Sequence, residues 1–200
     1  MFRYLLLIGA VAGAAAYFFL LRPDIGKTEE MLAEVASQIA GRPVSINCQG
    51  VIADAVDVSA AEGEVAFDED GKPADVAELK RGTCHDLADF PDSVNDERYR
   101  CLVSPDPCPK DIEKYVLAVH ILTHEAWHLR GVRDERIAEC YAIQTDELVA
   151  SRLGAGPSLA RAMAVYYAKE KYTELSSTYR TPACRNGGRY DLNRGSHAWP

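Results

Sequence analysis

The sequence predicts a mostly helical α+β domain. Apolar residues recur at helical spacing over several stretches, most clearly over residues 111–131. Two short runs, at 44–49 and 63–67, alternate apolar and polar residues as brief strands do. The chain has 200 residues, of which 48% are apolar and 26% charged. This length and composition suit one globular domain with a full hydrophobic core.

In the first half of the chain, helices alternate with the two predicted strands. Residues 27–41 are the first predicted helix of the domain, because Thr28 can cap its N-terminus and Gly41 suits its C-terminal end. After the strands, apolar residues at helical spacing predict a helix over residues 74–90. Four prolines and many polar residues predict a loop over residues 91–110.

The second half of the chain is predicted to be helical until its tail. The helix over residues 111–131 ends in a glycine, and Asp134 can cap the next helix, which runs to about Arg152. Pro157 opens a third helix that is predicted to reach residue 175. About three residues join the first two of these helices, so they are predicted to form an antiparallel hairpin.

The chain begins with an apolar segment, and residues 1–22 are predicted to be a transmembrane anchor. No charge occurs from Tyr4 to Leu21, a stretch that spans about 27 Å as a helix, close to the thickness of the hydrocarbon layer. A cleaved signal peptide, with the small residues around Ala15 as its cleavage site, is one alternative. A buried core helix is the other. Residues 23–200 then form the predicted domain.

The cysteines predict the compartment of this domain. They are even in number and none forms a C-x-x-C pair, which favours disulfides over a cysteine-zinc site. The alternative is six reduced, buried cysteines. Disulfides persist in oxidising compartments, so the domain is predicted to lie outside the cytoplasm, held at a membrane or secreted. The proline-bearing loop between Cys101 and Cys108 can fold back and predicts that pairing. The six are Cys48, Cys84, Cys101, Cys108, Cys140 and Cys184.

The stretch THEAWH at residues 123–128 contains the residues that indicate a metal site. His124 and His128 are four residues apart, so on a helix they share a face and can both bind one metal ion. Glu125 projects about 100° away from His124, where a carboxylate can hold the water on the metal rather than the metal itself. The motif predicts a Zn2+ site, with Glu125 as the general base.

Residues 123–141 resemble the zincin metallopeptidases, which share the H-E-x-x-H motif. The resemblance implies that His124 and His128 bind zinc together with a third protein ligand. In the metzincin branch the spacing of that ligand corresponds to Asp134 in HEAWHLRGVRD. Metzincins also have a turn that contains a methionine, and none of the three methionines here lies in such a turn.

The gluzincin branch is similar in another way. Its third ligand is a glutamate on a later helix, often in an E-x-x-x-D pattern whose aspartate holds the first histidine. The stretch ERIAE resembles that pattern with a glutamate in place of the aspartate, after a much shorter connection. The resemblance therefore implies Glu135 as the ligand and Glu139 as the partner of His124.

Helix geometry favours Glu139 as the ligand instead. In the predicted hairpin Glu139 lies level with the motif, and helical side chains lean toward the N-terminus of their own helix. This lean brings the side chain of Glu139 toward His128. It directs the side chain of Glu135 toward the loop that connects the two helices. Glu139 is the preferred third ligand, with Glu135 and Asp134 as the alternatives. The glutamate that is not a ligand would orient an imidazole.

Other candidates have simpler structural explanations. His120 lies one turn before His124 on the same face and could line the cleft, but a buried packing histidine is favoured. Tyr166 and Tyr167 could supply a hydroxyl that stabilises an oxyanion, as a tyrosine or histidine often does in zincins. Their helical spacing favours core and rim positions.

The predicted function is a membrane-anchored, extracytoplasmic zinc-dependent hydrolase, in the first place a metallopeptidase. Its partners would be an unidentified peptide or protein substrate and the membrane around residues 1–22. A net charge of −8 without a cluster of basic residues argues against nucleic acid as a partner. The alternative is a disulfide-braced envelope domain whose HExxH hairpin is structural or binds metal without turnover. The absence of a clear edge strand before the histidine helix, of the kind zincins use to hold a peptide, favours this alternative.

Overall fold

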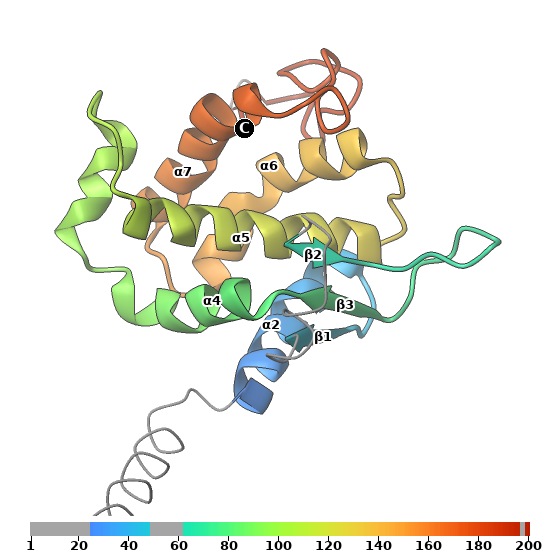
Figure 1. Cartoon of the computed structure of the whole chain (residues 1–200). Coiled ribbons are helices and arrows are strands. Elements are labelled where there is room, and N and C mark those ends of the chain that lie inside the picture. The colour runs from blue at the N-terminus through green and yellow to red at the C-terminus, as the bar shows by residue number, and fades with distance from the viewer. Residues whose placement is uncertain (1–24, 49–61, 197–198) are drawn as a thin grey trace, which may run out of the picture.

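The computed structural model describes residues 25–48, 62–196 and 199–200, and the structural statements below refer to these ranges. They form a mostly helical α+β fold with one small mixed sheet (Figure 1). The predicted anchor at residues 1–22 lies outside the described residues. Within them, no helix combines the length and the apolar character that crossing a membrane requires.

Helix α5 (Lys110–Leu129) runs through the middle of the fold (Figure 1). It packs against α2 (Ile25–Ala40), α4 (Arg81–Ser93) and α6 (Glu135–Arg152), and α7 (Pro157–Tyr166) packs on α6. The second half of α5 is buried on nearly all sides. The helix that carries the metal motif is therefore also the centre of the hydrophobic core.

The predicted C-terminal ends of α2 and α5 and the predicted N-cap of α6 are confirmed, whereas Thr28 does not cap α2, because the helix already includes Ile25 and Thr28 lies buried within it. Gly41 follows α2 and Gly131 follows α5, and both have positive φ angles, of 71° and 106°, which glycine adopts without strain. Asp134 is the N-cap of α6, since its Oδ1 accepts a hydrogen bond of 3.0 Å from the backbone N–H of Arg136. Helix α6 ends at Arg152 as expected.

The sheet has three strands in the order β1-β3-β2. Strand β1 (Ser45–Cys48) runs parallel to β3 (Val76–Leu79), and β2 (Gly63–Glu64) runs antiparallel to β3 at one edge. The strands predicted at 44–49 and 63–67 are thus present, the second much shorter than expected. Strand β2 lies beside α5 (Figure 1).

The helix predicted over residues 74–90 is wrong in its first half. Strand β3 occupies that part, and α4 begins only at Arg81. Along β3, Ala77 and Leu79 are buried while their neighbours are half-buried, which is the two-residue period of a strand. Pairing with β1 on one side and β2 on the other outweighs the helical spacing of a few apolar residues.

The loop predicted over residues 91–110 is partly helical. Helix α4 continues through Pro91 to Ser93, and a 3-10 helix follows at Glu97–Val103. The side chain of Asp96 caps this second segment. A local capping group thus orders a stretch that its prolines mark as irregular.

The third helix of the second half is shorter than predicted. The chain leaves α-helical geometry at Tyr166, forms a π-helical turn at Tyr167–Lys171 and a 3-10 turn at Tyr172–Glu174. π-Helical turns often occur at functional sites, and this one places a tyrosine in the site described below.

All six cysteines form disulfides, which confirms the predicted pairing in the 101–108 loop and leaves no free thiol. The three disulfides suggest an extracytoplasmic domain. One bridge joins the end of β1 to α4, one closes the loop before α5, and one joins α6 to the C-terminal segment. The pairs are Cys48–Cys84, Cys101–Cys108 and Cys140–Cys184.

Loop length predicts how much two of these bridges stabilise the fold. Cys48→Ala with Cys84→Ala opens a loop with a sequence separation of 36 and should lower the free energy of unfolding by about 4 kcal/mol. Cys101→Ala with Cys108→Ala opens a separation of 7 and should cost only about 2.5 kcal/mol. Urea unfolding followed by circular dichroism, with a chelator in every sample, measures both. Equal losses would contradict loop closure as the source of the difference.

Candidate metal centre

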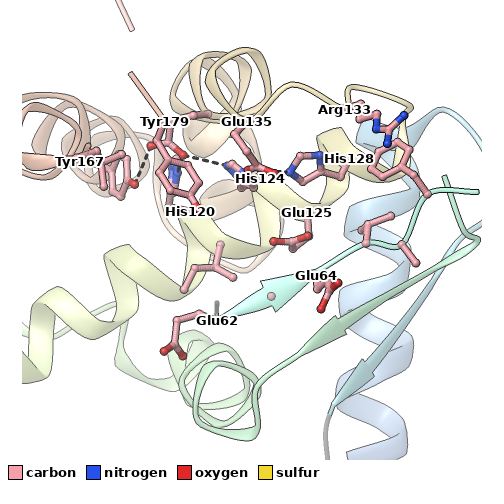
Figure 2. A pocket seen from close by; sticks show the side chains of 17 residues that line it. Glu62, Glu64, His120, His124, Glu125, His128, Arg133, Glu135, Tyr167 and Tyr179 are labelled. Atoms are coloured by element: carbon pink, nitrogen blue, oxygen red, sulfur yellow. Dashed lines mark hydrogen bonds and ion pairs between the residues drawn. The ribbon is translucent and has the colours of Figure 1, made fainter. Parts of the chain in front are cut away.

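The HExxH motif lies in the last turns of α5, where α6 packs against it. His124, Glu125 and His128 are all buried. Glu135 and Glu139 come from the first two turns of α6. Together with strand β2, these side chains line a pocket of about 910 Å³ (Figure 2).

Three possible ligand atoms lie close together in this pocket. His124 Nε2 lies 2.9 Å from His128 Nε2, and Glu135 Oε2 lies 3.1 Å and 3.3 Å from these two atoms. Tetrahedral zinc, with ligands at about 2.0–2.1 Å, holds its ligand atoms about 3.3 Å apart. The triangle therefore has nearly the dimensions of one face of a tetrahedral zinc site.

The other nitrogen of each imidazole fixes where its proton sits. His124 Nδ1 lies 2.9 Å from Glu139 Oε2, and His128 Nδ1 lies 2.6 Å from the carbonyl oxygen of Val132. Both partners are acceptors, so each Nδ1 carries a hydrogen and donates it. In the neutral rings both Nε2 lone pairs then face each other and a carboxylate oxygen. Such an arrangement requires a positive charge at its centre, from a metal ion or a proton.

The pKa values describe the same attraction for positive charge. Burial lowers the pKa of His124, but hydrogen bonds to Glu135 and Glu139 outweigh it and raise that pKa to about 9. Hydrogen bonds to His124 and His128 lower the pKa of Glu135 to about 2. A bound divalent cation would replace the proton that these groups otherwise share.

A second set of ligand atoms comes from His120, His124 and Glu139, and it too could hold a metal. His120 Nδ1 lies 2.8 Å from Asp146 Oδ2, and its Nε2 lies 3.0 Å from Glu139 Oε2. Burial lowers the pKa of His120, but the charges of Asp146 and Glu139 outweigh it and raise the pKa to about 10. A ring that donates from both nitrogens has no lone pair for a metal.

The two sets differ in access. The ring of Tyr167 stacks on His120 with centroids 3.5 Å apart, and the side chain of Glu139 is only 3% exposed. The side chain of Glu135 is 40% exposed and faces the pocket. Both sets border the pocket, and the set of His124, His128 and Glu135 is the more exposed of the two.

Glu139 is fully occupied by hydrogen bonds. Its Oε2 accepts from His120 and His124, and its Oε1 accepts from the hydroxyl of Tyr167 at 2.9 Å. Burial raises the pKa of Glu139, but the charge of His120 and these hydrogen bonds outweigh it and hold the pKa well below its usual range. Glu139 thus lies beside Nδ1 of His124. Glu135 lies beside the Nε2 atoms of both His124 and His128. The N-cap residue Asp134 belongs to neither set.

Glu125 is the remaining acid of the motif, and it belongs to neither set of ligand atoms. It is 5% exposed, and its Oε2 has no hydrogen-bond partner among the residues that the structure describes. Burial raises the pKa of Glu125 above its ordinary value. Figure 2 shows its carboxylate between the histidines and strand β2. A buried carboxylate oxygen without a partner is suited to a water molecule or substrate group.

Two parts of the pocket were not found by sequence reasoning. Strand β2 forms an edge beside the motif, although the sequence offered no clear edge strand before the histidine helix. Tyr179 lies with its ring centroid 6.2 Å from that of His124 and also lines the pocket. It comes from the tail, which has no periodicity to signal a role.

The tyrosines and histidine considered earlier take other positions. Tyr166 is buried and donates to Glu113. Tyr167 is buried as well and donates to Glu139. His120 is a buried, hydrogen-bonded histidine as favoured, but it also lines the pocket and contacts Glu139.

Comparison of the chain with protein-family models, with curated proteins and with solved structures gives no match.

Proposed function

We propose that this chain is a zinc-dependent peptidase in which His124, His128 and Glu135 hold the metal. The observation that carries this proposal is the convergence of two imidazole lone pairs and one carboxylate oxygen within 2.9–3.3 Å. Two imidazoles and a carboxylate are a frequent ligand set of catalytic zinc, which keeps a further position open for water. Zn2+ in such a site lowers the pKa of its water toward about 7 and polarises a substrate carbonyl.

Glu135 is preferred over Glu139 as the third ligand because of how their oxygens are used. Glu139 accepts three hydrogen bonds and orients His124 through Nδ1, as carboxylates beside metal-bound histidines commonly do. The polar contacts that Glu135 makes through Oε2 are with the two Nε2 atoms that would bind the metal. This arrangement corresponds to the gluzincin-like reading of ERIAE rather than to the reading from side-chain lean.

Turnover is supported by the position of Glu125. Its carboxylate is close to the ligand triangle, outside it, and has an oxygen without a partner among the described residues. Burial raises its pKa, which makes it a better acceptor for a proton from water. Glu125 would take that proton and pass it to the leaving amine. Tyr179 also lines the pocket, and its hydroxyl would donate a hydrogen bond to the substrate oxygen.

A peptide is the favoured substrate because the pocket has a strand along one side. Strand β2 is the edge of the described sheet, and the residues that follow it, as far as Phe67, line the pocket. An extended peptide can add to such an edge through main-chain hydrogen bonds. This edge removes one argument for the alternative of a non-catalytic envelope domain. We further propose that residues 1–22 anchor the domain at the outer face of a membrane, and that nucleic acid is not a partner.

The decisive experiment compares Glu125→Gln with the wild-type chain. The variant should keep about one zinc per chain, because Glu125 is not a ligand, and should lose at least about 100-fold in hydrolysis of a quenched-fluorescence peptide library. Glu30→Gln, an exposed change on α2, is the matched control and should change neither quantity. Zinc content is measured by plasma emission after gel filtration.

Bound zinc without cleavage that depends on Glu125 would support the envelope domain that binds metal without turnover. A chain without stoichiometric zinc would reject both the peptidase and the metal site.

A further inference from the structure

Strand β2 approaches the motif so closely that a side chain has no room at one position. A Cβ atom built on Gly63 would lie 2.7 Å from Cγ, 2.8 Å from Oε1 and 2.9 Å from Cδ of Glu125. Real Cβ atoms essentially never make contacts this short. The side chain of Glu125 therefore occupies the volume that any other residue at position 63 would fill.

The backbone does not require a glycine at this position. Gly63 is absent from the glycines with positive φ, and it pairs with Leu79 in regular antiparallel geometry. An alanine could adopt the same backbone conformation. Glycine also weakens a strand, and where one occurs inside a strand it often marks a close approach by another group. The contact with Glu125 is thus the physical reason for this glycine.

One oxygen of the Glu125 carboxylate is not held by any polar group of the described residues. Its Oε2 has no hydrogen-bond partner among the described residues, so polar contacts do not fix the position of that atom. The side chain is nevertheless buried, between α5 and β2. Packing against the bare backbone of Gly63 is therefore a contact that helps to set where the carboxylate lies.

We propose that Gly63 is a positioning residue that holds the general base, an inference that rests on the peptidase function proposed above. The missing side chain forms a notch in β2, and Glu125 fits into this notch with its carboxylate beside the metal ligands. The three atoms nearest to the built Cβ all belong to Glu125, and none belongs to His124, His128 or Glu135. A methyl group at position 63 should displace the base and leave the metal in place.

The test uses the full chain and compares Gly63→Ala with Gly82→Ala. Gly82 lies on α4, and a Cβ built there meets nothing within 4 Å, so this substitution is the matched control. Gly63→Ala should retain one zinc per chain and a KM near that of the wild type. Its kcat on a quenched peptide selected with the wild type should fall about 100-fold, a loss that a displacement of a reacting group by about 1 Å can cause. Gly82→Ala should match the wild type in zinc content, KM and kcat.

A second measurement does not depend on catalysis. Gly63→Ala should lower the urea midpoint of unfolding in the wild-type background and leave it unchanged in a Glu125→Ala background, where the clashing atoms are gone. Equal falls in both backgrounds, or a wild-type kcat in Gly63→Ala, would overturn the positioning role. If Glu125→Gln keeps full activity, the proposed peptidase fails, and the unfolding pair still decides whether Gly63 accommodates Glu125.

Discussion

Glu135→Ala is expected to abolish stoichiometric zinc binding, while Glu139→Ala should weaken it by about 10–100-fold. The first variant removes one of the three proposed ligand atoms, which all lie within 3.3 Å of one another. The second removes a group that orients His124, and losses of such partners typically fall in that smaller range. His124→Ala and His128→Ala should be as severe as Glu135→Ala.

Competition with a chromogenic chelator measures these affinities in one buffer. Asp134→Ala is the matched control, since it removes a neighbouring carboxylate that serves as the cap of α6. It should cost about 1 kcal/mol of stability and leave zinc affinity unchanged. If Glu139→Ala instead proves the most damaging, the metal occupies the more buried set with His120, and Glu135 is not a ligand.

His120→Leu is expected to lower the free energy of unfolding of the metal-free chain by about 3–5 kcal/mol near pH 6. His120 is buried between two carboxylates, those of Glu139 and Asp146, at 3.0 Å and 2.8 Å. Its positive charge balances both. Leucine fills much of the same space but leaves two buried negative charges without a cation between them, which is costly in the protein interior.

The loss should depend on pH in a defined direction. The pKa of His120 is raised to about 10 from an ordinary value of 6.5. Stability that comes from protonating His120 is therefore fully present below pH 6.5 and is lost as pH rises through about 10. Above that pH the wild-type chain also lacks the charge, so the difference between wild type and His120→Leu should shrink.

Urea unfolding with a chelator at pH 6 and at pH 10.5 tests this. Leu122→Ala, at a fully buried apolar position on the same helix, is the matched control. It should cost about 2–5 kcal/mol at both pH values because no charge is involved. A His120→Leu loss that is the same at both values would show that the ring acts through packing alone.

The sequence predicted the hairpin of α5 and α6 because local signals fix it. The motif has helical spacing, Gly131 ends one helix and Asp134 caps the next, and each signal acts over a few residues. The same reasoning could not choose between Glu135 and Glu139. That choice depends on how two helices pack and on side-chain rotamers, neither of which follows from spacing along one chain.

The parts of the fold and of the site that the sequence did not predict depend on contacts between distant segments of the chain. Strand β3 has only four residues, so its alternating pattern was too short to outweigh the helical spacing of the residues around it. Its pairing partner β1 lies 31 positions earlier in the chain. Gly63 looks like an ordinary glycine in a strand until α5 is placed against it. Tyr179 carries no local signal, because its role arises only when the tail is brought to His124.

The disulfide between Cys140 and Cys184 makes the assembly of the pocket depend on oxidation of the chain. Cys140 directly follows Glu139 on α6, and Cys184 lies five residues after Tyr179, on the segment that supplies one wall. A newly made chain in a reducing environment carries the histidine motif but lacks the covalent tie that keeps this wall beside it. Export and oxidation would then act as a maturation step, so that a latent precursor acquires its finished cleft only after it has left the compartment of its synthesis.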